Sequence, residues 1–290
     1  MARLCVEGAR RMYEYCGKKN LPHKRVGKLI VATRDSELPI LEDLYKRATA
    51  NGTMQKWVAP FAEALLSTGR GQIRTSFKVT GIDVDEEVAK GPAILPFRGN
   101  YQELKPEYRS IIKRNIYPTP DPKFPMVGVH LTPRVDGRVL IGPNAALALA
   151  KEGYSFWHIN IRDLLVFATT KGLWKLVLGN PSTVFTEIWR DINKRAFVAE
   201  AQRYCPSLQV EHTTDGWAGV HAVAVDDSGK IIGNFLFETG KAGRVLNVRN
   251  APSPACTSSL AIATSIVNQA IDDLDWKNEK LFKVEEEMAV

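Results

Sequence analysis

The stretch MVGVHLTPRVDGRVLIGP, residues 126–143, decides the fold, because two apolar runs flank a short polar step. The step is Val135, Asp136 and Gly137, and an Asp-Gly pair between apolar runs is a strong signal for a β-hairpin. We therefore expect two antiparallel strands in the middle of the chain, with His130 on the first of them.

On the N-terminal side of this hairpin, the pattern mixes helices and strands. Residues 2–16 predict a helix and residues 26–33 predict a short strand. A second helix is expected to begin near Ser36, which can cap it, and to close at Gly52. After a further helix, residues 72–84 alternate well enough for one or two strands.

On the C-terminal side, two long helical patterns precede a second strand-like region. Residues 160–178 predict one helix with Asn160 as its N-cap, and residues 182–204 predict another. Residues 218–240 predict a second antiparallel hairpin. A long helix rich in Ala and Ile, capped within 257–258, is expected last. The chain is thus predicted to be mixed α and β, with an at least partly antiparallel sheet.

Composition argues against several classes of protein. The 290 residues are 44% hydrophobic, which is enough for a substantial core. The formal net charge of +7 favours anionic partners, but the basic residues are scattered, so nucleic-acid binding gets little support. The four cysteines form no CxxC pair, so no metal site is predicted. No apolar run reaches the ~18 residues of a membrane span, which leaves peripheral membrane association open.

Three segments hold residues that suit anion or proton chemistry. Arg98 and Gly99 open a strand-like run, where glycine lets the backbone approach a ligand and arginine clamps an anion, unless Arg98 is a surface residue in a turn. His130 can act as a base near pH 7 or be an ordinary structural residue. Arg249 and Asn250 precede a helix N-terminus that suits an anion, although an ordinary capped helix has the same pattern.

Three stretches, taken together, resemble the signatures of the L-2-hydroxyglutarate dehydrogenases. They are PFRGNYQELKPE (96–107), NIYPTPDPKFPMVGVHLTPRVDGRVLIGPNA (115–145) and LNVRNAPSPACTSSLAIA (246–263). ARLCVEGARRMYEYC and KRVGKLIVAT resemble a more N-terminal region of that family. The resemblance implies a flavoprotein of the D-amino-acid-oxidase-like class. Its fold would be α+β or α/β, with a mixed, mostly antiparallel substrate-domain sheet with helices and remnants of a Rossmann-type FAD domain.

The resemblance also implies a reaction and roles for particular residues. The family oxidises L-2-hydroxyglutarate, a small dicarboxylate, to 2-oxoglutarate by hydride transfer to FAD. His130 is then the candidate base for the hydroxyl proton, and Arg98 with Arg134 are candidate contacts for substrate carboxylates. The residues expected to contact the flavin are Gly99, Asn250, Ser253, Pro254, Ala255, Thr257 and Ser258.

The chain departs from the family pattern at several places. The glycine-rich GxGxxG fingerprint of the opening βαβ unit has no counterpart, and family stretches are missing after Gly52 and within 84–91. His221 stands where the family usually has Arg, and it is expected to be a plain strand residue. The resemblance divides the chain into an FAD-domain remnant (1–92), a substrate domain (93–240), a returning FAD-contact loop and helix (241–275) and a frayed tail (276–290).

These departures leave two functions open. The first is FAD-dependent oxidation of L-2-hydroxyglutarate, and the second is a non-catalytic truncated isoform or gene-model fragment that cannot hold FAD. A basic nucleic-acid binder, the third reading, would need salt-sensitive affinity. The resemblance implies a mitochondrial location, although this chain shows no targeting segment. The sequence indicates no oligomeric state.

Overall fold

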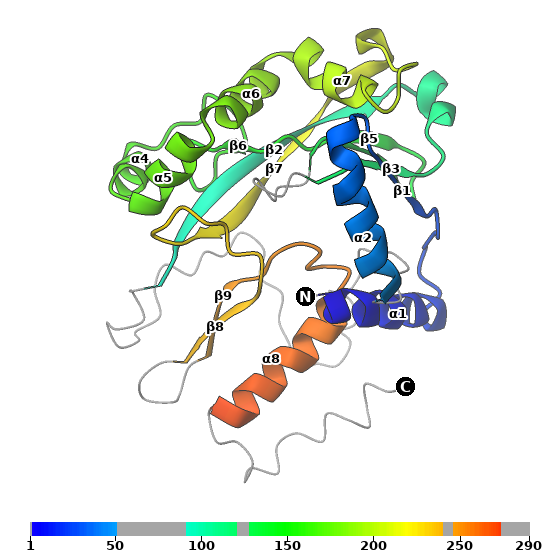
Figure 1. Ribbon diagram of the computed structural model, residues 1–290. Coiled ribbons are helices and arrows are strands. Elements are labelled where there is room, and N and C mark those ends of the chain that lie inside the picture. Colours follow the sequence, from blue (N-terminus) through cyan, green and yellow to red (C-terminus); the bar gives the residue numbers. More distant parts are fainter. Residues whose placement is uncertain (1, 51–90, 121–127, 240–245, 274–290) are drawn as a thin grey trace. The chain divides into compact units, whose positions relative to one another are not determined.

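The computed structural model describes residues 2–50, 91–120, 128–239 and 246–273 (Figure 1). These residues belong to two compact units. The sheet unit comprises Pro22–Gln55 and Pro92–Gly233. The helix-pair unit comprises Met1–Leu21, Lys56–Gly91 and Asn234–Val290. The strands predicted within 72–84, the helix expected before them and the tail 276–290 lie outside the described residues.

A mixed sheet organises the sheet unit, and it has seven strands within the described ranges. The order is β1-β3-β4-β5-β2-β6, and β7 pairs with β2. β1 and β3 run parallel, whereas the other pairings are antiparallel. This confirms the mixed, mostly antiparallel sheet. The strands are β1 (Lys28–Val31), β2 (Ala93–Leu104), β3 (Asn115–Pro118), β4 (His130–Pro133), β5 (Val139–Gly142), β6 (Ala146–Leu147) and β7 (Thr213–Val225).

The predicted central hairpin is confirmed as β4 and β5. His130 is the register partner of Gly142, and Pro133 is the partner of Val139. Gly137 has a φ of 83°, which glycine adopts without the steric cost that a side chain would impose. The Asp-Gly step therefore makes the turn that its sequence predicts.

Four helices lie along one face of this sheet (Figure 1). They are α4 (Ile161–Ala168), α5 (Lys171–Gly179), α6 (Pro181–Ile192) and α7 (Lys194–Gln202). Under α7, Phe197 and Val198 pack with Leu131 and Ile141 of the hairpin in one core cluster. A second cluster joins α4 and α5 to β2 and β7. No helix in the described part of the chain is long and apolar enough to cross a membrane.

Both long predicted helices are interrupted, so the expectation of single helices is wrong there. Asn160 does cap α4, because its side chain accepts hydrogen bonds from Arg162 N and Asp163 N at 3.0 and 3.2 Å. The helix ends where the hydroxyls of Thr169 and Thr170 both donate to the Val166 carbonyl, at 2.9 and 3.0 Å. Such local bonds compete with continuation of the helix.

The second break falls at Asn193, whose side chain accepts from Ala196 N at 3.2 Å. Asn193 thus serves as the N-cap of α7 after α6 has ended. Ser36 gives another correction, because it lies within the 3-10 helix η1 (Asp35–Glu37) and α2 (Leu38–Ala50) begins after it. Two further 3-10 helices are η3 (Pro106–Ile111) and η4 (Val210–His212).

The second predicted hairpin, over 218–240, forms at its turn but not along its strands. At the turn, Asp226 N donates to the Lys230 carbonyl, Ile232 N donates to the Ala224 carbonyl, and Val225 bridges Ile231. Beyond the turn, β7 pairs along most of its length with β2. β8 (Leu236–Thr239) pairs instead with β9 (Leu246–Asn250) in a two-stranded sheet. The twelve residues of β2 offer β7 a longer ladder of hydrogen bonds than a local hairpin would.

The helix-pair unit is built on α1 (Ala2–Lys18) and α8 (Ser259–Asp273). Met12, Tyr13 and Cys16 form its buried cluster, with Leu260 of α8 packed against them. Gly8 allows close packing, because a Cβ at this position would lie 2.5 Å from Ser258 Cα. The N-terminal helix is therefore confirmed, and Gly8 lets the start of α8 pack closely against it.

Candidate functional site

His130 lies on β4 with its ring in a defined orientation. Nδ1 is 3.0 Å from the carbonyl oxygen of Gly128, so a ring protonated at Nδ1 donates there and leaves Nε2 as an acceptor. Burial lowers the pKa of His130 to about 4, the Gly128 carbonyl opposes this shift, and the positive charge of Lys28 adds to it. The imidazole is thus neutral at pH 7, as a proton acceptor must be.

Tyr117 and Lys28 complete a stack with His130. The rings of Tyr117 and His130 are 4.0 Å apart between centroids and inclined by 14°. The Lys28 ammonium lies 3.7 Å from the Tyr117 centroid, a cation-π contact. Ile116 and Leu131 are register partners that pack in the core under α7. Because side chains alternate along strands, Tyr117 and His130 occupy the opposite face of the sheet.

Arg98 is a buried residue of the sheet unit. Its side chain is 1% exposed and pairs through Nη2 with the carboxylate of Asp191, which is 0% exposed. Asn100 Nδ2 and Asn144 Nδ2 also donate to Asp191, at 2.7 and 3.1 Å. Nε and Nη1 of Arg98 have no hydrogen-bond partner within the described residues. Arg98 is thus an interior residue and not the surface arginine that its local pattern also allowed.

Gly99 and Arg134 differ sharply in their surroundings. A Cβ on Gly99 would lie 2.4 Å from Pro143 Cβ and 2.9 Å from the Asn144 carbonyl oxygen. The backbone that approaches Gly99 is therefore that of the segment after β5. Arg134 lies at the hairpin turn, where its Nη2 is 3.3 Å from Asp136 Oδ2 and its side chain is 36% exposed. The roles assigned to both residues stay predictions.

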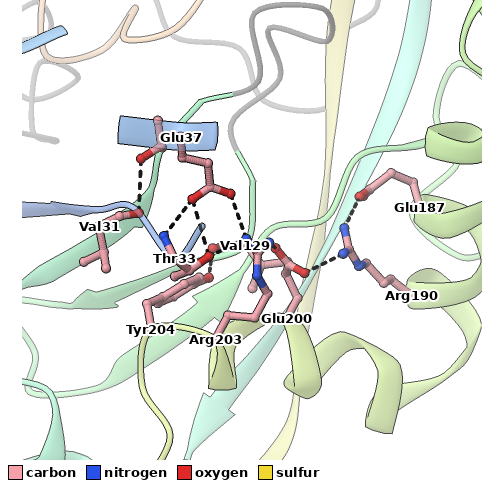
Figure 2. A network of polar contacts seen from close by, with 10 residues as sticks. Val31, Thr33, Glu37, Val129, Glu187, Arg190, Glu200, Arg203 and Tyr204 are labelled. Carbon is pink, nitrogen blue, oxygen red and sulfur yellow. Dashed lines mark hydrogen bonds and ion pairs between the residues drawn. The ribbon is translucent and has the colours of Figure 1, made fainter. Parts of the chain in front are cut away.

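A chain of alternating charges joins α6, α7 and η1 (Figure 2). Arg203 contacts Glu37 at 2.9 Å and also pairs with Glu200. Arg190 then joins Glu200 to Glu187, at 2.6 and 2.7 Å. Because each acid and base is only partly exposed and shares its partners, these ion pairs form a network and not isolated surface contacts.

One contact of this network, and one hydrogen bond next to it, hold the backbone beside Gly99 and His130. Glu187 Oε2 accepts from Ala145 N at 2.8 Å, which holds the segment that packs on Gly99. Tyr204, two residues after the end of α7, donates its hydroxyl to the carbonyl of Val129, the residue before His130 (Figure 2). Burial raises the pKa of Tyr204, so the hydroxyl stays protonated and keeps donating.

The predicted flavin-contact residues of the helix-pair unit lie between β9 and α8. Asn250 is buried, and its Nδ2 donates to the Asn234 carbonyl at 2.8 Å. Ser253 and Pro254 are exposed, whereas Ala255 and Thr257 are half-buried. Ser258 is buried, and its hydroxyl has no hydrogen-bond partner within the described residues.

The orphaned Ser258 hydroxyl bears on the fit of a cofactor. Buried polar groups are normally satisfied by protein, water or ligand. An unpartnered hydroxyl at the start of α8, where backbone N–H groups also lack helical partners, suits a group rich in hydrogen-bond acceptors. The residues present in this loop therefore fit a flavin ring, although the roles of the individual residues stay predictions.

Several residues that contact Arg98 or lie beside His130 were not predicted from the sequence. Asp191, Lys28 and Tyr117 belong to elements that lie far from Arg98 and His130 in the sequence or carry no motif. Asn144 lies in IGPNA, the end of the family-like stretch 115–145, but no role was predicted for it. His221, predicted to be a plain strand residue, pairs with Phe97 in the β2–β7 ladder.

Similar proteins fall into one class of enzyme. A family model described as FAD dependent oxidoreductase matches residues 68–269. The mitochondrial L-2-hydroxyglutarate dehydrogenase of Nematostella vectensis is 35% identical over 93% of this chain and 77% of that protein. The corresponding Homo sapiens protein is 33% identical over 92% and 75%. The Escherichia coli (strain K12) L-2-hydroxyglutarate dehydrogenase is 29% identical over 92% and 78%.

A solved structure and the alignment lengths add two points. The L-alpha-glycerophosphate oxidase of Mycoplasma pneumoniae, solved with FAD bound, gives a TM-score of 0.60 at 17% identity over 95% of this chain and 80% of that one. This likeness supports the fold. The Nematostella alignment runs over 352 residues, more than the 290 of this whole chain, so that relative has internal stretches that this chain lacks. The predicted internal shortening is thereby confirmed.

Proposed function

The chain belongs to the L-2-hydroxyglutarate dehydrogenases within the FAD-dependent oxidoreductases, and on this premise we propose that it oxidises L-2-hydroxyglutarate to 2-oxoglutarate. When bound, FAD supplies the two-electron oxidation of the substrate carbon. Similarity over most of the length of both chains carries the proposal. The neutral His130 also supports the proposal, because its Nε2 is available to accept a proton from the substrate.

In this proposal, His130 Nε2 accepts the proton of the substrate hydroxyl. The Nδ1 contact with Gly128 fixes the ring so that the same nitrogen always faces the substrate. Arg98 and Arg134 bind carboxylate, Arg98 through the edge that Asp191 leaves unpaired and Arg134 from the exposed turn. Asn250 and the loop up to Ser258 hold the flavin.

We also propose that the protein associates peripherally with a membrane in the mitochondrion. The relatives named above from animals are described as mitochondrial. Helices α4, α5 and α6 expose large apolar side chains at a spacing of four residues, which puts each pair on one helical stripe. These pairs are Ile161 and Leu165, Trp174 and Leu178, and Phe185 and Trp189, all at least 47% exposed.

Visible spectroscopy tests the proposed reaction. The chain of residues 1–290 is purified with and without added FAD, and flavin bands that co-elute with folded protein are measured before and after adding L-2-hydroxyglutarate without oxygen. We expect stoichiometric flavin that bleaches with this substrate and stays oxidised with D-2-hydroxyglutarate. Folded protein without flavin would favour the alternative, a non-catalytic isoform or fragment, and would overturn the proposal.

A further inference from the structure

Lys28 offers a positive charge beside the candidate base, on a strand that no site prediction included. β1, β3 and β4 are adjacent in the sheet, and each contributes one member of the stack. Lys28 and Tyr117 share a face, because Lys28 is the register partner of Asn115 and Ile30 is the partner of Tyr117. The ammonium and the imidazole therefore flank one aromatic ring on the face opposite the α7 core.

The ammonium of Lys28 has no acidic partner among the residues that the structure describes. Its recorded contact is with the ring of Tyr117, at 3.7 Å from the centroid. Lys28 is exposed on β1, so its charge is accessible to a ligand from solvent. A cation held on an aromatic face near a neutral histidine is suited to receive an anion from that ligand.

The substrate class provides such an anion. A 2-hydroxy dicarboxylate of five carbons carries one carboxylate next to the reacting carbon and a second one three carbon–carbon bonds away. If the reacting hydroxyl lies at His130, the first carboxylate stays near the base and the second reaches away from it. The centre of the His130 ring and the Lys28 ammonium lie 4.0 and 3.7 Å from the centre of the same Tyr117 ring, so the two groups are close enough for one five-carbon dicarboxylate to contact both.

We propose that Lys28 is a specificity-determining residue, which binds the distal carboxylate of a dicarboxylate whose hydroxyl is held at His130. This inference rests on the proposed function and deepens it. Tyr117 positions both groups, because its ring carries the ammonium and stacks on the imidazole. A 2-hydroxy monocarboxylate has no second anion and gains nothing from Lys28.

Calorimetric titration of the full chain, with FAD added, tests this role. The ligands are 2-oxoglutarate and the monocarboxylate 2-oxobutyrate, and the proteins are wild type, Lys28→Met, Lys28→Arg and the control Lys113→Met, which removes one exposed charge before β3. A lost charge-assisted contact corresponds to about 10-fold or more in affinity. We expect Lys28→Met to weaken 2-oxoglutarate that much and to leave 2-oxobutyrate unchanged. Lys28→Arg should keep most of the preference.

Three results would overturn the inference. Equal weakening of both ligands by Lys28→Met would mean that Lys28 only supports the Tyr117–His130 stack. A preference for the dicarboxylate that survives Lys28→Met would assign the distal carboxylate elsewhere. If the wild-type chain holds flavin but binds 2-oxoglutarate no more tightly than 2-oxobutyrate, there is no contact with a distal carboxylate, although flavin chemistry is still possible. The flavin spectrum, measured on the same samples, therefore separates failure of the inference from failure of the proposed function.

Discussion

Replacing Asp191 with Asn removes the negative charge that faces Arg98 inside the sheet unit. Both side chains are almost completely inaccessible to water, at 0% and 1% exposure. Asp191 also accepts hydrogen bonds from Asn100 and Asn144. Removing one partner of a buried ion pair costs about 3–5 kcal/mol, because the other charge is left without compensation in a low-dielectric interior. We expect Asp191→Asn to lower the free energy of unfolding by about 3 kcal/mol or more.

Urea unfolding followed by tryptophan fluorescence measures this loss, since Trp157 and Trp189 lie in the same unit. Asp215→Asn is the matched control. Asp215 is 84% exposed and pairs with Lys194 at 3.2 Å, so its loss should cost at most about 1 kcal/mol.

A double variant provides the second arm of this test. Arg98→Met combined with Asp191→Leu removes both charges, so no ion is left stranded, and such replacements are often neutral or stabilising. We therefore expect the double variant to be more stable than Asp191→Asn. If Asp191→Asn is no more damaging than the exposed control, the reasoning that a buried charge pair organises this region is refuted.

Three further outcomes are expected. Gly8→Ala should destabilise the chain by about 1–3 kcal/mol, because the new Cβ would meet the Ser258 backbone at 2.5 Å, whereas Gly17→Ala, with nothing within 4 Å, should be neutral or stabilising in thermal melts. The free energy of unfolding should fall as pH drops from 6.5 towards 4, because His130 becomes protonated in the unfolded chain but, with its pKa of about 4, stays neutral in the folded one. His130→Gln should flatten this slope, and an unchanged slope would contradict the assignment. Phe185→Glu with Leu178→Glu should reduce co-sedimentation with anionic lipid vesicles, and equal sedimentation of variant and wild type would contradict membrane association.

The sequence by itself determined features that depend on neighbouring residues. The Asp-Gly step predicted the β4–β5 turn, because a positive φ at Gly137 is a local property of glycine. Asn160 was predicted as an N-cap for the same kind of reason, since its side chain bonds the amides two and three residues on. The family signatures could also be recognised from the sequence, because they are runs of adjacent residues.

Local pattern also set limits on what could be predicted. Helical periodicity continues through residues 160–178, but it does not show where side-chain hydrogen bonds end a helix. Thr169 and Thr170 could have raised that question, because threonine hydroxyls often bond a carbonyl of the preceding turn. Asn193 likewise carried a capping signal in the middle of a predicted helix.

Only the tertiary structure decided which distant segments meet. β7 has alternating residues that suit a hairpin, yet it pairs with β2, more than a hundred residues earlier in the chain. Asp191 carries no motif and becomes the counter-charge of Arg98 only when α6 packs near β2. Lys28 meets Tyr117 and His130 because three short strands share a sheet. Strand pairing and buried charge depend on which surfaces fold against one another, and a local sequence pattern does not specify that partner.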